Sequence, residues 1–255
     1  MPEAFRDIDF PGAQGTEAFA INNQGQIVGV YFDAAGLGHG YVLDGDPADP
    51  EAYTPIDVGD PPLNTYVSGI NDEGVIVGSF MDAREERVRG FRLTGTLLEI
   101  FDASAEPTDA TIVNGINNEG LIYGGYGEFD PILGQPHTCL AYALDPNLNP
   151  ISRFALEDAP VTVIMGINAD GVMSGFYDLD AEDDTQGTHG FLLFGDEPVN
   201  PIDIGEGQTV ISAINDMGAF VGFNNFSEAS VGFLALTNPQ RIFLPLIARD
   251  ANLTP

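Results

Sequence analysis

Five times along the chain, a stretch of alternating apolar and small polar residues is followed by a short polar segment and a second apolar run. The clearest copy spans residues 65–80 and reads TYVSGINDEGVIVGSF. Alternation with period two, rich in β-branched residues, is typical of a strand. Asn71 followed by Gly74 indicates a tight turn, because an Asn side chain bonds nearby backbone and Gly accepts a positive φ. The pattern predicts a β-hairpin in each copy.

The five copies share a fixed spacing. Each begins at a threonine and has an asparagine six residues later, and successive asparagines lie 49, 46, 51 and 47 residues apart. The threonines are Thr16, Thr65, Thr111, Thr162 and Thr209, and the asparagines are Asn22, Asn71, Asn117, Asn168 and Asn215. Strict alternation would place Thr65, Val67, Gly69 and Asn71 on one face of the strand and Ile70 on the other. These residues recur in every copy. Five equivalent turns explain this better than five active sites would, so we interpret the repeated Thr, Asn and Gly as structural.

Each copy continues into two more strand-like runs, such as Gly40–Leu43 and the Ile-Asp run Pro55–Val58. Four short strands in about 47 residues match one blade of a β-propeller, whose repeats are about 40–50 residues long. We therefore predict an all-β protein with residues 1–255 in a single domain. It should be a five-bladed β-propeller with four antiparallel strands per blade. Phe and Tyr should fill the space between blades, since the chain has 17 Phe and no Trp.

A further Ile-Asp run stands before the first threonine, at residues 6–10 (RDIDF). It matches the fourth run of the other copies better than the C-terminal residues 241–246 do. We therefore expect residues 5–10 to close the ring by completing the outer edge of the fifth blade, beside Gly232–Leu236. Closure of this kind would hide strand edges that otherwise template aggregation.

The combined pattern resembles a family of probable extracellular repeat proteins that is named for a His-Ala-Phe motif. The best copy is residues 8–13 (IDFPGA), then Thr16, Asn22, residues 27–31 (IVGVY) and residues 39–41 (HGY). The resemblance covers nearly the whole chain and implies propeller-like repeats and export, but no particular activity. The His position departs from the family in three copies, where it is Arg89, Leu140 and Val231. A shared role for the histidine is therefore not expected.

Composition narrows the classes of partner. The chain has 39 Asp and Glu against eight Arg and no Lys, a formal net charge of −31. Such acidity argues against nucleic acid and anionic membranes as partners and favours cationic ones, and it also favours solubility. The other explanation of the negative charge is adaptation to high salt. No run approaches the about 18 apolar residues of a membrane helix, and no signal sequence is evident, so a cytoplasmic location stays open beside the secreted one. We expect a monomer, with Cys139 as a small buried apolar residue.

Variable loops mark the expected site face. If the four strands alternate in direction, the loops between the second and third strands share one face with the starts of the Thr strands, and these loops vary in length. Function commonly lies in variable loops on a rigid scaffold. The loops open with an acidic or amide residue: Asp33, Asp82, Glu128, Asp178 and Asn225. Such a ring could hold a hard cation or supply an acid/base pair, with His137 as a further acid/base candidate.

Two local clusters give sharper candidates. Asp178, Asp180, Glu182, Asp183 and Asp184 present the oxygen ligands that Ca²⁺ prefers, although the Gly and distal Glu of an EF-hand loop are missing. A solvated acidic loop is the alternative.

The second cluster has Arg84, Arg87 and Arg89, which could bind an anionic group bidentately; the alternative is pairing with Glu85, Glu86 and the surrounding acidic residues. His39 and His189, at equivalent places in non-neighbouring copies, should each bond backbone or a carboxylate rather than share a metal.

Two functional hypotheses follow. One is a binding module that holds a small molecule, glycan or cation at the variable-loop face of the channel, with Arg84, Arg87, Arg89 and Asn225 as ligand-binding residues. The other is an enzyme of lyase, hydrolase or cyclase type, with one central pocket and Asp33, Asp82, Glu128, Asp178 or His137 as acid/base groups. No nucleophile elbow, phosphate loop or zinc-binding pattern appears in the sequence. The absence of these patterns and the regularity of the repeats favour binding.

Overall fold

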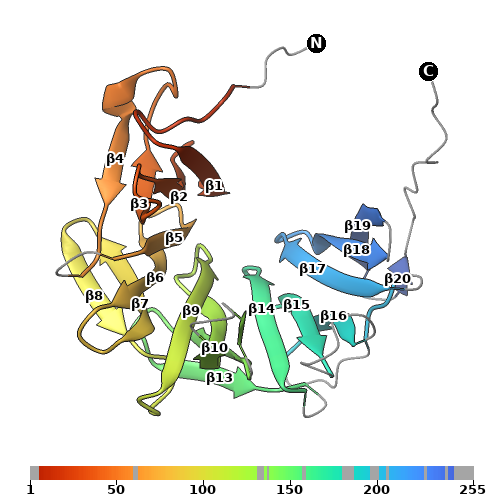
Figure 1. The fold of residues 1–255 in the computed structure, drawn as a ribbon. Coiled ribbons are helices and arrows are strands. Elements are labelled where there is room, and N and C mark those ends of the chain that lie inside the picture. Colours follow the sequence, from red (N-terminus) through yellow and green to blue (C-terminus); the bar gives the residue numbers. More distant parts are fainter. Residues whose placement is uncertain are drawn as a thin grey trace.

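The protein is an all-β propeller of five blades, as expected. The computed structural model describes residues 6–59, 63–130, 135–136, 138–156, 159–179, 187–195, 201–204, 207–226, 229–238 and 241–243. In Figure 1 five antiparallel sheets follow one another round a common axis in chain order. Within the described residues the only helical element is a short 3-10 turn at Pro50–Ala52. No helix among them has the length and apolar character needed to cross a membrane.

Each blade is a meander whose first strand lies nearest the axis (Figure 1). Blade one has β1 (Gly15–Ile21), β2 (Ile27–Phe32), β3 (Gly38–Leu43) and β4 (Tyr53–Ile56). Blade two has β5 (Thr65–Ile70), β6 (Ile76–Asp82), β7 (Arg87–Thr94) and β8 (Leu97–Phe101). Blade three has β9 (Asp109–Ile116), β10 (Ile122–Asp130), β12 (Leu140–Leu144) and β13 (Pro150–Phe154), and β11 (Gln135–Pro136) pairs with the end of β10.

The last two blades follow the same plan. Blade four has β14 (Val161–Ile167), β15 (Met173–Asp178) and β16 (Thr188–Leu193). Its fourth position is held by one bridge between Gly190 and Ile202 instead of a full strand. Blade five has β17 (Gln208–Ile214), β18 (Ala219–Phe226), β19 (Ala229–Asn238) and β20 (Arg241–Phe243).

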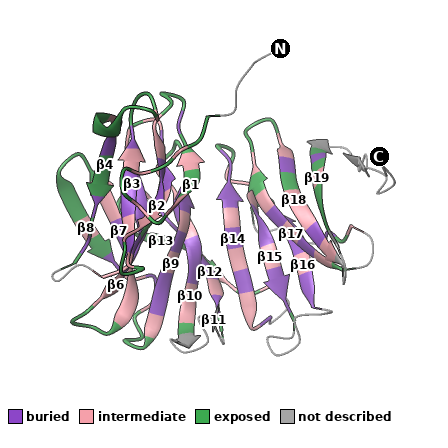
Figure 2. Cartoon of the chain, turned by 45° about the horizontal axis from the view of Figure 1, so that its top comes forward, coloured by how far each residue is buried: buried purple, intermediate pink, exposed green. Residues whose placement is uncertain are grey.

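Most of the hydrophobic core lies between neighbouring blades, and one further cluster, with Tyr41, Leu43 and Tyr53, lies within blade one. Val28 and Ile56 of blade one pack with Phe80 and Phe91 of blade two in one buried cluster. The next interfaces repeat this arrangement, and between blades two and three Tyr142 is fully buried. Buried residues therefore follow the inner strands, while β4 and β8 carry exposed residues at the outer edge (Figure 2). Phe and Tyr fill the space between blades as predicted, and Cys139 is buried as expected.

The predicted Asn-x-x-Gly turn is present in all five blades. In blade two the Asn71 Oδ1 accepts hydrogen bonds from the backbone N–H groups of Glu73 (3.1 Å) and Val75 (2.9 Å). Gly74 has φ +75° and donates its N–H to the Asn71 carbonyl. Positive φ at this position is inexpensive only for glycine, which explains the repeated residue.

Strict alternation along the first strand is wrong beyond its third residue, because every first strand contains a β-bulge. In blade two the register shifts between Val67 and Gly69, and Ser68 is the extra residue. The same shift occurs in the other four blades. A bulge inserts one residue and re-aims the side chains around it. Thus Gly69, Ile70 and Asn71 do not keep the faces that strict alternation assigns to them.

Closure of the ring by residues 5–10 is also not what the structure shows. Ile8 and Phe10 pack on blade one against Tyr31, Tyr41 and Tyr53, and the Phe10 and Tyr31 rings stack at 3.6 Å. This aromatic surface gives the segment an apolar partner within its own blade. β20 instead forms the outer strand of blade five, pairing with Leu236–Asn238. No described strand of blade five pairs with blade one, and the two blades flank an opening in Figure 1.

Candidate functional site

The carboxylates expected to form a site on the loop face act as turn caps. Asp33 Oδ1 accepts hydrogen bonds from the N–H groups of Ala35 and Leu37, both at 2.8 Å. The bond from Leu37 is the largest cause that lowers the pKa of Asp33. Asp82 caps the equivalent turn by accepting from the Arg84 N–H at 2.9 Å. These side chains therefore hold hairpins in shape.

The remaining loop-face candidates lie apart from one another. Asp178 is buried and accepts a hydrogen bond from Thr188 Oγ1 at 2.8 Å, within blade four. Glu128 is exposed near the end of β10, and Asn225 pairs across blade five with Gln208. His137 lies outside the described residues. None of the described candidates lines either of the cavities on the axis.

The arginine cluster is engaged with protein carboxylates. Arg89 places Nε and Nη2 on the two oxygens of Asp102, at 3.0 and 2.8 Å, and its Nη1 on Asp82 at 3.2 Å. Arg87 Nη2 also reaches Asp102 at 3.0 Å. The hydrogen bond to Asp102 is the largest cause that raises the pKa of Arg89. Arg84 lies exposed on the same hairpin. The partners of Arg87 and Arg89 are thus Asp82 and Asp102 rather than Glu85 and Glu86.

The two described histidines occupy the same structural place as Arg89. His39 Nδ1 lies 2.6 Å from Asp57 Oδ1, and His189 Nδ1 lies 2.8 Å from Asp203 Oδ1. Each pair joins the third strand of a blade to the segment that follows it. The expectation that each histidine bonds a neighbouring carboxylate is confirmed. Each His–Asp pair therefore connects two segments of the same blade.

The proposed Ca²⁺ cluster reaches the described part of the chain only at Asp178. Asp180, Glu182, Asp183 and Asp184 lie outside the described residues. Among the residues that the structure does describe, no group of three or more His, Cys, Asp or Glu side chains is placed to hold a metal ion. The Ca²⁺ site therefore stays a sequence prediction.

The axis of the propeller, in contrast, contains a cavity of about 740 Å³ lined by the first strands. We call it the channel cavity. The bulged residue of every blade lines it: Phe19, Ser68, Asn114, Met165 and Ser212. The bulge directs these side chains toward the axis, since it re-aims the strand at this point. Five different residues thus meet in one place.

Two aromatic rings of the channel cavity are accessible. Phe19 is 51 % exposed and Tyr66 is 40 % exposed, although both lie on inner strands. Serine hydroxyls and the Asn114 amide supply polar groups nearby, and Asn114 Nδ2 itself donates to the Ile164 carbonyl at 2.9 Å. The described residues that line this cavity include no Asp, Glu, Arg or His. The cavity offers apolar surface with a few hydroxyl and amide groups, as small-molecule sites usually do.

A second cavity, of about 370 Å³, lies at the Asn-turn end of the axis; we call it the mouth. Around it the Asn side chains form a ladder from blade to blade. Asn22 Nδ2 donates to the Asn71 carbonyl at 3.1 Å, and three more such bonds link the following blades up to Asn215. The Asn therefore shapes its own turn through Oδ1 and fixes the next blade through Nδ2.

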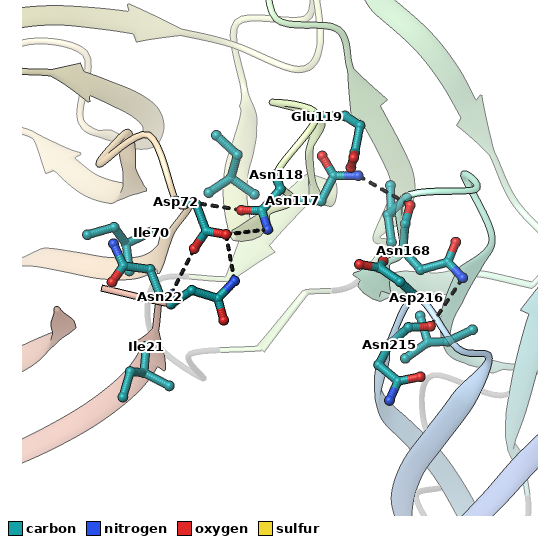
Figure 3. A pocket seen from close by; sticks show the side chains of 14 residues that line it. Ile21, Asn22, Ile70, Asp72, Asn117, Asn118, Glu119, Asn168, Asn215 and Asp216 are labelled. Atoms are coloured by element: carbon teal, nitrogen blue, oxygen red, sulfur yellow. Dashed lines mark hydrogen bonds between the residues drawn. The ribbon is translucent and has the colours of Figure 1, made fainter. Parts of the chain in front are cut away.

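Asp72 lies at the centre of a second network at the mouth (Figure 3). Its carboxylate accepts hydrogen bonds from the Asn23 backbone N–H (2.8 Å), the Asn23 Nδ2 (2.6 Å) and the Asn118 Nδ2 (2.8 Å). These donors, led by the Asn23 N–H, lower the pKa of Asp72. Glu119 and Asp216 add exposed carboxylates to the lining. The mouth is therefore polar and negative.

Reasoning from the sequence took its candidate residues from the loop face and named none of the residues that line the channel cavity. One signal was available: the residue three after each threonine varies from Phe to Ser, Asn and Met, while the residue before it is always Ala, Val or Ile and the residue after it always Ala or Gly. A variable position inside a repeated strand indicates a role specific to each blade. Its direction could not be foreseen, because strict alternation hides the bulge.

Comparison with known proteins adds only a likeness in fold. No family model matches the chain, and no curated protein matches it. Among solved structures, the SapL1 lectin in complex with α-methyl fucoside is similar at 11 % identity and a TM-score of 0.38, over 96 % of this chain and 98 % of that one. A mutant of the Aleuria aurantia lectin in complex with Fucα1-6GlcNAc has 9 % identity and a TM-score of 0.29, over 86 % and 91 %. Similarity this low says nothing of what the present chain binds.

Proposed function

We propose that the protein is a binding module that holds one small organic ligand in the channel cavity. The observation that carries the proposal is the ring of bulged residues, in which Phe19, Ser68, Asn114, Met165 and Ser212 face one space. The repeats keep the residues that build the turn and the strand, and they vary the residue that faces the axis. Binding sites commonly vary on a constant scaffold in this way.

The chemistry of the lining favours a ligand with an apolar face and hydroxyl groups. Phe19 and Tyr66 present accessible rings, and the serine hydroxyls and the Asn114 carbonyl oxygen can hydrogen-bond. Sugars combine an apolar ring face with hydroxyl groups, so monosaccharides and their aromatic glycosides belong to this class. Acid–base catalysis is not favoured at this place, because its described lining supplies no carboxylate or imidazole.

Binding can be tested by calorimetric titration and ligand-observed NMR with monosaccharides, aryl glycosides and simple aromatic alcohols. We expect Phe19→Ala and Tyr66→Ser each to weaken binding by about tenfold or more, the usual effect of losing a large aromatic contact. Phe194→Ala is the matched control, because Phe194 is equally exposed (47 %) but lies on the turn after β16, away from the axis.

Two results would oppose the proposal. One is a panel in which no member binds. The other is a ligand whose affinity is unchanged in both channel variants, since that ligand must bind elsewhere on the surface.

A further inference from the structure

The channel cavity and the mouth adjoin along the axis. Ile21, Ile70 and Ile116 line both spaces, so the two cavities meet at these isoleucines. Along the first strand the bulged residue comes first, then the isoleucine, then the Asn turn and its neighbour at the mouth. A ligand that occupies the channel cavity therefore lies next to the mouth.

The two cavities differ sharply in polarity. The channel cavity is lined by apolar, hydroxyl and amide groups, whereas Asp72, Glu119 and Asp216 line the mouth. No Arg or His is among the described residues that line either cavity. The hydrogen bonds from Asn23 and Asn118 keep Asp72 ionised by stabilising its charged form. Negative charge at the mouth is therefore not cancelled by a local cation.

We propose that the ligand is an amphipathic organic cation. Its apolar body lies in the channel cavity against Phe19 and Tyr66, and its ammonium group lies at the mouth among Asp72, Glu119 and Asp216. This rests on the proposed function, because it names the ligand class of the same site.

The sign of the ligand's charge follows from the field as well as from the contacts. The net charge of −31 raises the local concentration of cations and repels anions, and a cleft lined by carboxylates concentrates that field. Exposed ion pairs contribute little individually, so the gain over a neutral ligand of the same shape should be about tenfold. Because the carboxylates at the mouth are accessible to solvent, salt should reduce this gain.

The test uses three probes that share a phenyl group and differ in the charge of the terminal group: 2-phenylethylammonium, 2-phenylethanol and phenylacetate. Their dissociation constants are measured by calorimetry or ligand-observed NMR at low salt and at high salt. We expect the ammonium to bind about tenfold more tightly than the alcohol at low salt, the carboxylate to bind most weakly, and the advantage to shrink as salt screens the charges.

Charge-removing variants locate the effect. Glu119→Gln and Asp216→Asn should each reduce the advantage of the ammonium probe several-fold and leave the affinity of the alcohol unchanged. Asp216→Asn keeps the carbonyl oxygen that accepts from the Ala169 N–H (2.8 Å), so the turn is preserved. Glu106→Gln, an exposed carboxylate outside both cavities, is the control and should change neither affinity.

The outcomes separate this inference from the proposed function. Equal affinity for the ammonium and the alcohol, both reduced by Phe19→Ala, would overturn the amphipathic cation and leave the binding module standing. The amphipathic cation is also overturned if both mouth variants leave the advantage of the ammonium intact. If none of the three probes and no member of the carbohydrate panel binds, the proposed function itself fails.

Discussion

The glycine four residues after each turn glycine, such as Gly78, lies against a backbone carbonyl of the strand beside it. At Gly78 an added Cβ would lie 2.1 Å from the Tyr66 carbonyl oxygen and 2.9 Å from the Phe91 ring. The counterparts Gly29, Gly124, Gly175 and Gly222 meet the equivalent carbonyl at 1.9 to 2.1 Å. The bulge pushes this carbonyl toward the neighbouring strand, and only a residue without Cβ leaves room for it.

We therefore expect Gly78→Ala to destabilise the fold by about 1–3 kcal/mol or more, the usual cost of overpacking a buried site. Gly15→Ala is the control, because its nearest neighbour would be a Phe32 ring carbon at 3.8 Å, an ordinary contact. Thermal unfolding followed by circular dichroism measures both. A Gly78→Ala protein as stable as the Gly15→Ala protein would contradict the tight approach of the two strands.

At this scale the sequence predicted the turn well and the bulge not at all. The roles of Asn71 and Gly74 follow from local chemistry, since both act within four residues of themselves. The role of Gly78 depends on a carbonyl across the hairpin, so its repetition could be seen but not explained. The direction of Ser68 depends on the same bulge, which is why the axial site could not be derived by alternation.

The threonine that opens each copy joins two elements. Its hydroxyl oxygen accepts a hydrogen bond from the backbone N–H of the segment before it, as between Thr111 and Ala103 (2.9 Å) or Thr65 and Val58 (3.1 Å). Thr65 and Thr111 are fully buried. The threonine thus ties the end of one blade to the inner strand of the next.

We expect Thr111→Val to cost about 1–3 kcal/mol, because the buried Ala103 N–H loses its acceptor while the side-chain volume is kept. Thr111→Ser keeps the oxygen and loses only a methyl group, so it should cost about 0.8 kcal/mol. Thr54→Val, on the exposed face of β4, serves as the control and should change stability by no more than about 0.5 kcal/mol. Denaturant unfolding of the three variants gives the comparison. Valine tolerated as well as serine would show that this hydrogen bond does not stabilise the blade junction.

At the level of strands, residues 6–10 show which contacts of a repeated segment its sequence can predict and which it cannot. Phe10 donates its N–H to Thr16 Oγ1 at 2.9 Å, so residues 8–10 make the contact that the Ile-Asp runs make elsewhere. Sequence similarity identified residues 6–10 as a further Ile-Asp run. It could not foresee the partner strand, because that choice depends on the aromatic surface of Tyr31, Tyr41 and Tyr53 and on the position of blade five.

At the scale of the whole molecule, stability depends on how many neighbours a blade has. Each core cluster that lies between blades spans two consecutive ones, so blades two, three and four are packed on both sides. Among the described residues, blade five packs on blade four alone, and its Val221 and Leu234 are more than 40 % exposed. Ile21 of blade one is 65 % exposed, whereas its counterpart Ile70 is 6 % exposed. In an array of this kind the stability of a unit follows its interfaces with its neighbours.

Hydrogen exchange measured by mass spectrometry should therefore show a gradient along the chain. Amides of β18 should exchange at least about tenfold faster than those of β6 and β10, the corresponding second strands of blades two and three, because local opening costs less where one interface is missing. These strands are matched in position within the blade, so the comparison isolates the number of neighbours. Equal protection of the three strands would mean that blade five gains a second interface in solution, and the opening beside it would then have to be closed by blade one or by another chain.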